Sequence, residues 1–166
     1  MGIEIERKYV IELPPLDAMR ATEGYTCSEI TQIYVEDDPS VTHRVRRRAY
    51  PDRVVYTETV KRRIDAISSV EDESEIGEEE YALLAARMKR GTHPVIKTRH
   101  TFPYRRRTVE VDVYPEWSRS CILEVELDDP SAEVELPPFI RILREVTGEW
   151  EYKNAAMAHS FPEELI

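Results

Sequence analysis

Alternation of charged with apolar side chains runs through most of this sequence and limits its fold more than any other feature. In Glu4–Val10 the side chains of Glu4, Glu6 and Lys8 share one face of an extended strand, because residues two apart point the same way. The same period predicts eight strands, over Ile3–Ile11, Glu29–Glu36, Thr42–Ala49, Val54–Arg62, Val70–Ile76, Val95–Thr101, Thr108–Tyr114 and Cys121–Leu127. Many short alternating segments are typical of an antiparallel β protein.

A few segments follow a helical pattern instead. Glu78–Arg90 begins with three glutamates and ends in two cations and Gly91, the charge order that a helix dipole and a C-cap favour. Phe139–Thr147 repeats this pattern, and shorter helices are predicted after Pro15 and over Tyr152–His159. The 166 residues contain no low-complexity linker and no fixed-period repeat. We therefore expect one domain over residues 1–166, mainly β (α+β), with a few covering helices.

Composition limits the possible partners and the compartment. The chain has 33 acidic and 23 basic residues and a formal net charge of −10, which argues against non-specific binding to nucleic acid or to an anionic membrane. Cys27 and Cys121 have no metal-binding spacing and are interpreted as reduced thiols. The sequence shows no signal-peptide core and no apolar run approaching ~18 residues. We expect a cytoplasmic monomer or homodimer with no membrane and no nucleic-acid partner.

The charged faces carry pairs of like sign rather than mixed polar residues. The pairs are Arg44 with Arg46, Lys97 with Arg99, Glu71 with Glu73, Glu110 with Asp112, and Glu124 with Glu126. Like charges two residues apart lie roughly 7 Å from each other and repel unless something between them compensates. For any single strand a solvated face is the ordinary interpretation. For the whole set, closing about eight strands with these faces inward would line a lumen with charges of both signs.

Such a lumen is costly to bury without a ligand of matching charge. Hard divalent cations suit the carboxylates, because Mg²⁺ prefers oxygen ligands. A polyanion suits the ammonium and guanidinium groups, and phosphate matches the arginine fork. A complex of a metal ion with a polyphosphate would satisfy both sets.

The strand motifs resemble, in order, those of the CYTH domain, the triphosphate tunnel metalloenzyme superfamily. "EIERK" at Glu4–Lys8 matches the family's ExExK signature. The later matches are "QIY" at Gln32–Tyr34, "RVR" at Arg44–Arg46, "TVK" at Thr59–Lys61, "IKTR" at Ile96–Arg99, "VDVY" at Val111–Tyr114, "LEVEL" at Leu123–Leu127, and "EVTG" and "YKN" near the C-terminus. The resemblance covers nearly the whole chain. It departs from the family pattern in "SSVEDESEI", which lacks the usual preceding arginine and leaves the register of Glu71, Glu73 and Glu75 open.

The resemblance implies an eight-stranded antiparallel β-barrel that forms a tunnel, with triphosphate bound by basic residues and divalent metal by acidic ones. The implied substrate-binding residues are Lys8, Arg44, Arg46, Lys61, Lys97 and Arg99. The implied ligands of Mg²⁺ or Mn²⁺ are Glu4, Glu6, Glu71, Glu73, Asp112, Glu124 and Glu126. The implied catalytic residues are Lys97 and Lys8; Lys97 matches a lysine proposed to act on the attacking water, and a metal-activated water is an equal alternative.

Other residues of the sequence are given no definite catalytic or binding role. Arg47, Arg48, Arg106 and Arg107 are interpreted as structural ion pairs or as exposed cations. Tyr34 is interpreted as a packed strand tyrosine, and Lys153 as equally able to enter the tunnel or to stay outside it.

The activity implied first is hydrolysis of inorganic triphosphate to pyrophosphate and phosphate. The family's other activities stay open as alternatives: thiamine-triphosphate hydrolysis, removal of an RNA 5′-triphosphate, and cyclisation of ATP to cyclic AMP. A non-catalytic binder of polyphosphate or nucleotide is a further alternative, as is an ordinary acidic β domain. Full retention of both charge sets argues against a binder, since binding alone would not need the metal ligands.

Overall fold

A computed structural model describes residues 2–166 and consists mainly of long antiparallel strands. The strands are β1 (Gly2–Glu12), β2 (Thr26–Tyr34), β3 (Thr42–Ala49), β4 (Val54–Arg63), β5 (Ser68–Ile76), β6 (Val95–Tyr104), β7 (Arg107–Val113), β8 (Ser120–Glu126) and β9 (Ile142–Glu145). The helical segments are α1 (Leu16–Arg20), α2 (Glu78–Ala85), the 3₁₀ turn η1 (Trp150–Tyr152) and α3 (Asn154–Met157). The eight strands predicted from the alternation all form, with bounds shifted by a few residues at their ends.

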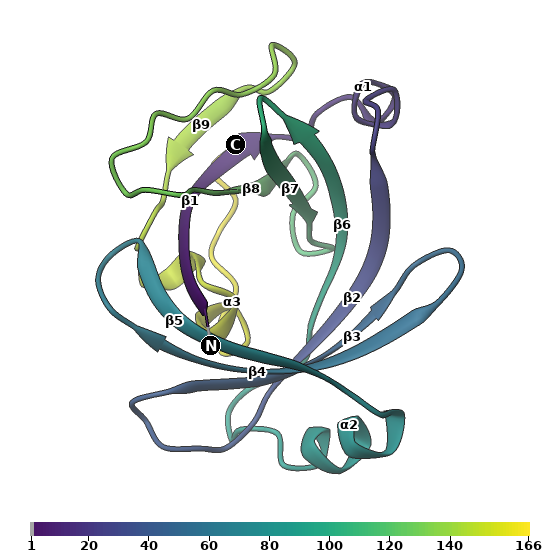
Figure 1. Cartoon of the computed structure of the whole chain (residues 1–166), viewed down its shortest axis with the longest axis vertical. Helices are drawn as coiled ribbons and strands as arrows, with labels where there is room; N and C mark the ends of the chain where they lie inside the picture. Colours follow the sequence, from purple (N-terminus) through teal and green to yellow (C-terminus); the bar gives the residue numbers. More distant parts are fainter. Residues whose placement is uncertain (1) are drawn as a thin grey trace.

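Eight of these strands close into a barrel. Their order is β5-β4-β3-β2-β6-β7-β8-β1, and β5 pairs with β1 to complete the ring. Figure 1 shows the strands curling around a central space, with the crossing of β2 to β5 on one side and β1 with β6 to β8 on the other. Closure pairs most of the sheet edges and gives every strand an inside and an outside face. The predicted eight-stranded antiparallel barrel is therefore confirmed.

The seam at β1 explains why β9 is a strand. The first half of β1 pairs with β5, through Gly2–Ile5, and its second half pairs with β8 over Glu6–Glu12. Since β8 occupies one edge, the other edge of the second half is free, and β9 pairs there. The helix predicted over Phe139–Thr147 is thus wrong, because this open backbone edge outweighs the local helical pattern.

The helix predicted over Glu78–Arg90 forms only as the shorter α2. No residue of α2 is buried, so little packing stabilises its continuation. Beyond it the chain returns to the barrel: the Lys89 amide donates to the carbonyl of Tyr34, and Met88 forms a bridge with Val35. The helix predicted after Pro15 forms as α1, and the segment predicted over Tyr152–His159 forms as η1 and α3. Within residues 2–166 no helix is long and apolar enough to span a membrane.

Two apolar clusters flank the barrel wall. Outside it, Ile11, Val111 and Leu123 pack beneath the segment between β8 and β9, which contributes Leu136 and Phe139. A second cluster lies on the inside, where Val10, Tyr34, Val95, Tyr114 and Ile122 pack against the C-terminal residues Tyr152, Met157, Ala158 and Phe161. In Figure 1 the C-terminal part of the chain, in yellow, lies within the outline of the ring. Apolar side chains therefore fill part of the interior, and a polar cavity occupies the rest.

Candidate functional site

Strand register carries the predicted charged faces to the interior of the barrel. Lys97 on β6 lies opposite Ile30 on β2, and Arg46 on β3 lies opposite Gln32 on β2. Lys97 and Arg46 line one cavity of about 280 Å³ together with Glu4, Glu6, Lys8, Arg44, Lys61, Glu71, Glu73, Arg99, Glu124 and Glu126. All the predicted site residues thus border a single cavity, with the exception of Asp112. Of the three acids whose register was open, Glu71 and Glu73 border it and Glu75 does not.

Asp112 lies behind the cavity wall, fully buried, at the centre of an ion-pair network. Its Oδ1 accepts from Arg99 Nε at 2.7 Å, and its Oδ2 accepts from Arg99 Nη2 and from Lys97 Nζ, both at 2.8 Å. Arg99 also donates to Glu110 at 2.8 Å. Because both oxygens of Asp112 are already engaged by cations of the chain, the arrangement does not fit the predicted role of metal ligand. It fits a group that positions Arg99 and Lys97.

Lys97 is the most completely buried cation of the cavity wall. Besides Asp112, its Nζ donates to Asn154 Oδ1 at 3.4 Å, and the same oxygen accepts from the Tyr114 hydroxyl at 2.7 Å. Burial lowers the pKa of Lys97 to about 7, opposed by Asp112 and reinforced by Arg99 and Arg46. A lysine in this state can exchange a proton near neutral pH, as a general base requires.

Two arginines of β3 extend the basic wall. Arg46 donates to the amide oxygen of Gln32, and burial with the neighbouring Arg44 and Arg99 lowers its pKa to about 9. The Nε atom of Arg44 is buried without a hydrogen-bond partner among the described residues. Unpaired, buried guanidinium nitrogen is costly, and an anion in the cavity would relieve that cost.

Carboxylates crowd together on the β1, β5 and β8 side of the cavity. Burial and the nearby Glu124 raise the pKa of Glu6 to about 8, against the opposing effect of Lys8. Burial and a hydrogen bond with Glu71 also raise the pKa of Glu4. Burial opposes ionisation of Glu124 as well, but Lys8, whose Nζ lies 3.2 Å from its Oε1, acts together with Arg99 and Lys97 to lower the pKa of Glu124. Glu4 and Glu6 lack this much nearby positive charge.

This crowding suits a divalent cation. Among residues 2–166 no three acidic, histidine or cysteine side chains are already gathered at coordinating positions. The donor set is nevertheless all oxygen, a buried Glu71 oxygen has no hydrogen-bond partner, and Glu4 and Glu6 have raised pKa values. A hard cation would replace the protons that these groups retain. The chemistry of the residues present therefore fits Mg²⁺ or Mn²⁺.

The structure adds cavity residues that sequence reasoning did not assign. Glu110, Tyr34, Lys153 and Asn154 line the cavity, and so does Arg48. Of the two interpretations of Arg48, full solvent exposure is wrong, because it shares the inward face of Arg44 and Arg46, is partly buried and donates to Ser28 at 2.8 Å. Glu110 could have been predicted, because it lies two residues before Asp112 and so shares the same face of the strand. Nothing in the sequence located Asn154 beside Lys97, since that contact depends on how the C-terminal segment folds back.

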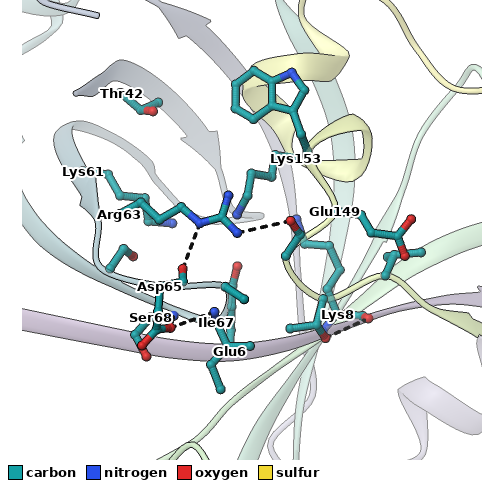
Figure 2. A pocket seen from close by; sticks show the side chains of 16 residues that line it. Glu6, Lys8, Thr42, Lys61, Arg63, Asp65, Ile67, Ser68, Glu149 and Lys153 are labelled. Carbon is teal, nitrogen blue, oxygen red and sulfur yellow. Dashed lines mark hydrogen bonds between the residues drawn. The ribbon is translucent and has the colours of Figure 1, made fainter. Parts of the chain in front are cut away.

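Two smaller cavities adjoin the main one. A side pocket of about 110 Å³ lies between β1, the β4–β5 turn and the segment before α3. Figure 2 shows Lys61, Arg63 and Lys153 on one side of it, with Glu6 and Lys8 on β1 below. A third cavity of about 230 Å³ lies beside the β2–β3 connection. Thr42, Lys61 and Trp150 border all three cavities, so these cavities meet at one place.

Comparison with solved structures finds a match along nearly the whole chain. The inorganic triphosphatase NE1496 is 27% identical, with a TM-score of 0.59, and the match covers 98% of this chain and 99% of that one. No family model matches the sequence, and a search of curated proteins found no significant match.

Two more distant structures share the fold. The PH1819 protein from Pyrococcus horikoshii OT3 is 20% identical, with a TM-score of 0.57 over 77% of this chain and 80% of that one. A putative adenylate cyclase from Bacillus halodurans is 16% identical, with a TM-score of 0.52 over 78% and 84%. The closed eight-stranded barrel, the ordered motifs on its inner face and the match to an inorganic triphosphatase agree with the resemblance to the CYTH, or triphosphate tunnel metalloenzyme, superfamily.

Proposed function

We propose that this protein hydrolyses inorganic triphosphate to pyrophosphate and phosphate with the help of a divalent metal ion. The observation that carries the proposal is the single cavity in which a basic wall faces a crowd of carboxylates. The match of 27% identity to an inorganic triphosphatase over nearly the full length of both chains supports the same activity.

In this proposal the phosphate chain lies against the basic wall. Five cations neutralise its oxygens and stabilise the charge that develops as the bridging P–O bond breaks. They are Arg44, Arg46, Lys8, Lys61 and Arg99. Asp112 contributes by holding Arg99 through two hydrogen bonds, so that the guanidinium does not have to reorganise during the reaction. Pyrophosphate then leaves with the electron pair of the broken bond.

Water supplies the new P–O bond. Lys97, with its pKa of about 7, takes the water proton when its amine is neutral, and Asp112 and Asn154 keep its Nζ in place. The carboxylates that would hold Mg²⁺ or Mn²⁺ are Glu4, Glu6, Glu71, Glu73, Glu124 and Glu126. When bound, the ion would neutralise phosphate oxygens and acidify a water, which is the alternative to Lys97 as the source of the nucleophile.

The direct test is phosphate release from inorganic triphosphate with Mg²⁺, with Mn²⁺ and with EDTA. Turnover that requires metal and is lost in Glu4→Gln/Glu6→Gln is expected. Glu75→Gln is the matched control, because Glu75 lies on β5 but does not border the cavity. Metal-independent turnover, or full activity in the double variant, would refute the assignment of the metal to these carboxylates.

One observation favours an organic triphosphate as a second candidate substrate. Trp150 is 58% exposed and borders all three cavities, so its indole could stack on an aromatic ring attached to the phosphates. Running ATP and thiamine triphosphate in parallel tests this candidate, and detection of cyclic AMP would identify a cyclase. Preference for an organic substrate that disappears in Trp150→Ala would replace inorganic triphosphate as the assignment.

A further inference from the structure

The side pocket beside β1 has an excess of unpaired positive charge. Lys8, Lys61, Arg63 and Lys153 border it, together with Glu6, Asp65 and Glu149. Two of these three carboxylates are engaged elsewhere. The Asp65 carboxylate accepts from the amides of Ile67 and Ser68, and Glu149 accepts from Arg144 at 2.8 Å. Among the described residues no acid of the pocket forms an ion pair with Arg63 or Lys153, and the nearby Asp65 and Glu6 offset only part of their charge.

Arg63 and Lys153 are the cations that lack an acidic partner. Arg63 donates to the carbonyls of Asp65 at 2.8 Å and Gly148 at 3.3 Å, and Figure 2 shows both contacts. It has no ion pair with a carboxylate among the described residues, and the Lys153 side chain has neither an ion pair nor a hydrogen bond there. Burial, with Lys8, Arg63 and Lys61 nearby, lowers the pKa of Lys153, against the opposing effect of Glu6. Arg63 is exposed and Lys153 is half-buried, and two neighbouring cations without an ion-pair partner can bind an anion.

The walls of this pocket are firmly placed. Gly148 has a φ of +77°, and a Cβ at this position would lie 2.7 Å from the carbonyl oxygen of Ala66. The chain before η1 and the β4–β5 turn therefore touch backbone to backbone, and Arg63 joins them again through the Gly148 carbonyl. These two contacts hold the walls of the pocket and Arg63 in place when no anion is present.

The pocket is continuous with the main cavity. Six of its residues also border that cavity: Glu6, Lys8, Thr42, Lys61, Trp150 and Lys153. Arg63 is different, because it borders the side pocket and the third cavity but not the main one. A phosphate chain lying along the basic wall would reach Lys61 and Lys153 before it reached Arg63.

We propose that the side pocket is an additional phosphate subsite, centred on Arg63 and Lys153. It takes either the fourth phosphate of a linear polyphosphate longer than triphosphate or a free orthophosphate. Its use during turnover rests on the proposed hydrolase function, whereas binding of the anion does not. Specific recognition comes from the Arg63 guanidinium and the Lys153 ammonium, with hydroxyl groups of Ser68 and Thr42 on the walls.

The first arm of the test compares linear tetraphosphate with triphosphate as substrates. We expect the ratio of their kcat/KM values to fall about 10-fold in Arg63→Gln, as for loss of one charge-assisted hydrogen bond. A smaller fall is expected in Arg63→Lys, which keeps the charge. Lys89→Gln is the matched control, because it removes one exposed cation that borders only the third cavity. Lys153→Gln provides a second variant whose lost side chain makes no hydrogen bond in the structure.

The second arm measures binding of orthophosphate by titration calorimetry without metal. Weaker binding in Arg63→Gln and Lys153→Gln, with an unchanged tetraphosphate ratio, would identify orthophosphate as the occupant. A changed ratio would identify the fourth phosphate. If the wild type hydrolyses neither substrate but binds phosphate through Arg63, the hydrolase proposal fails and the subsite stands. Equal behaviour of wild type and both variants in both arms, with thermal unfolding unchanged, would overturn the subsite.

Discussion

Asp112→Asn tests the ion-pair network that the structure places behind the cavity. The substitution keeps the shape of the side chain but removes the charge shared by Lys97 and Arg99. Three charge-assisted hydrogen bonds end on this carboxylate, and each contributes about 1.5–3 kcal/mol. Asparagine keeps one acceptor oxygen, and Arg99 keeps Glu110, so only part of that sum is lost. Breaking a buried pair typically costs about 3–5 kcal/mol, which is the loss we expect.

The measurement is urea unfolding at pH 7, followed by circular dichroism. A loss of this size is a large part of the total stability of a domain, about 5–15 kcal/mol, so the midpoint should fall markedly while the slope m stays unchanged. Asp72→Asn is the matched control, because Asp72 is an exposed acid on β5. It should change the free energy of unfolding by less than about 0.5 kcal/mol.

A double variant separates the effect on Lys97 from general damage. In Asp112→Asn the pKa of Lys97 falls further, because the carboxylate that raised it is gone, and its polar amine stays buried without its ion-pair partner. Replacing Lys97 with methionine should therefore relieve part of the loss. Asp112→Asn/Lys97→Met is expected to be more stable than Asp112→Asn alone by about 1–2 kcal/mol, within the range measured for coupled residues. A loss below about 1 kcal/mol for the single variant, or a fully additive cycle, would refute the network as described.

Three further predictions follow from the same structure. The kcat/KM for triphosphate should rise with pH through about 7 as Lys97 loses its proton, and Lys97→Arg should abolish this limb of the pH–rate profile. Without metal, the pKa of Glu6 is about 8 in the folded state, so between about pH 5 and 8 the folded protein keeps a proton that the unfolded protein has lost. The free energy of unfolding should therefore fall by up to about 1.4 kcal/mol for each unit by which the pH rises in this range. Urea titrations of Glu6→Gln should lack this component, and an unchanged slope would contradict the assignment. Gly148→Ala should cost at least about 1–2 kcal/mol in a thermal melt, because its left-handed φ and the Ala66 carbonyl both resist a Cβ.

The strands were predictable because alternation is a property of each strand alone. Glu124 and Leu123 must point to opposite sides wherever the strand lies, and the register confirms the faces assigned from the sequence. The short β9 was not predictable in this way. Its four residues form a strand because β1 offers a free edge at Tyr9–Ile11. That edge is free because β5 pairs only with Gly2–Ile5 of β1.

Depth along the barrel is the property that the alternation could not reveal. The inward faces of three strands run from an apolar residue to charged ones. The order is Val10, Lys8 and Glu6 on β1; Tyr114, Asp112 and Glu110 along β7 and the residue that follows it; and Ile122, Glu124 and Glu126 on β8. The charges next to the apolar end are paired within the chain, as in Lys8 with Glu124 and Lys97 with Asp112. One residue pair further along, Glu6 and Glu126 lie opposite each other in the register of β1 and β8, with no ion pair to either among the described residues.

This layering changes which acids are available to a metal ion. The sequence motifs predict the same role of metal ligand for Asp112 and Glu6, because each is an inward-facing acid on a barrel strand. In the fold, Asp112 is neutralised by two cations and its pKa falls well below its usual range, despite its burial, whereas the pKa of Glu6 is raised. An incoming divalent ion gains most where negative charge is least compensated. We therefore expect the metal to be held chiefly by Glu4, Glu6 and their neighbours in the outer layer, with Asp112 left to hold the cations that contact phosphate.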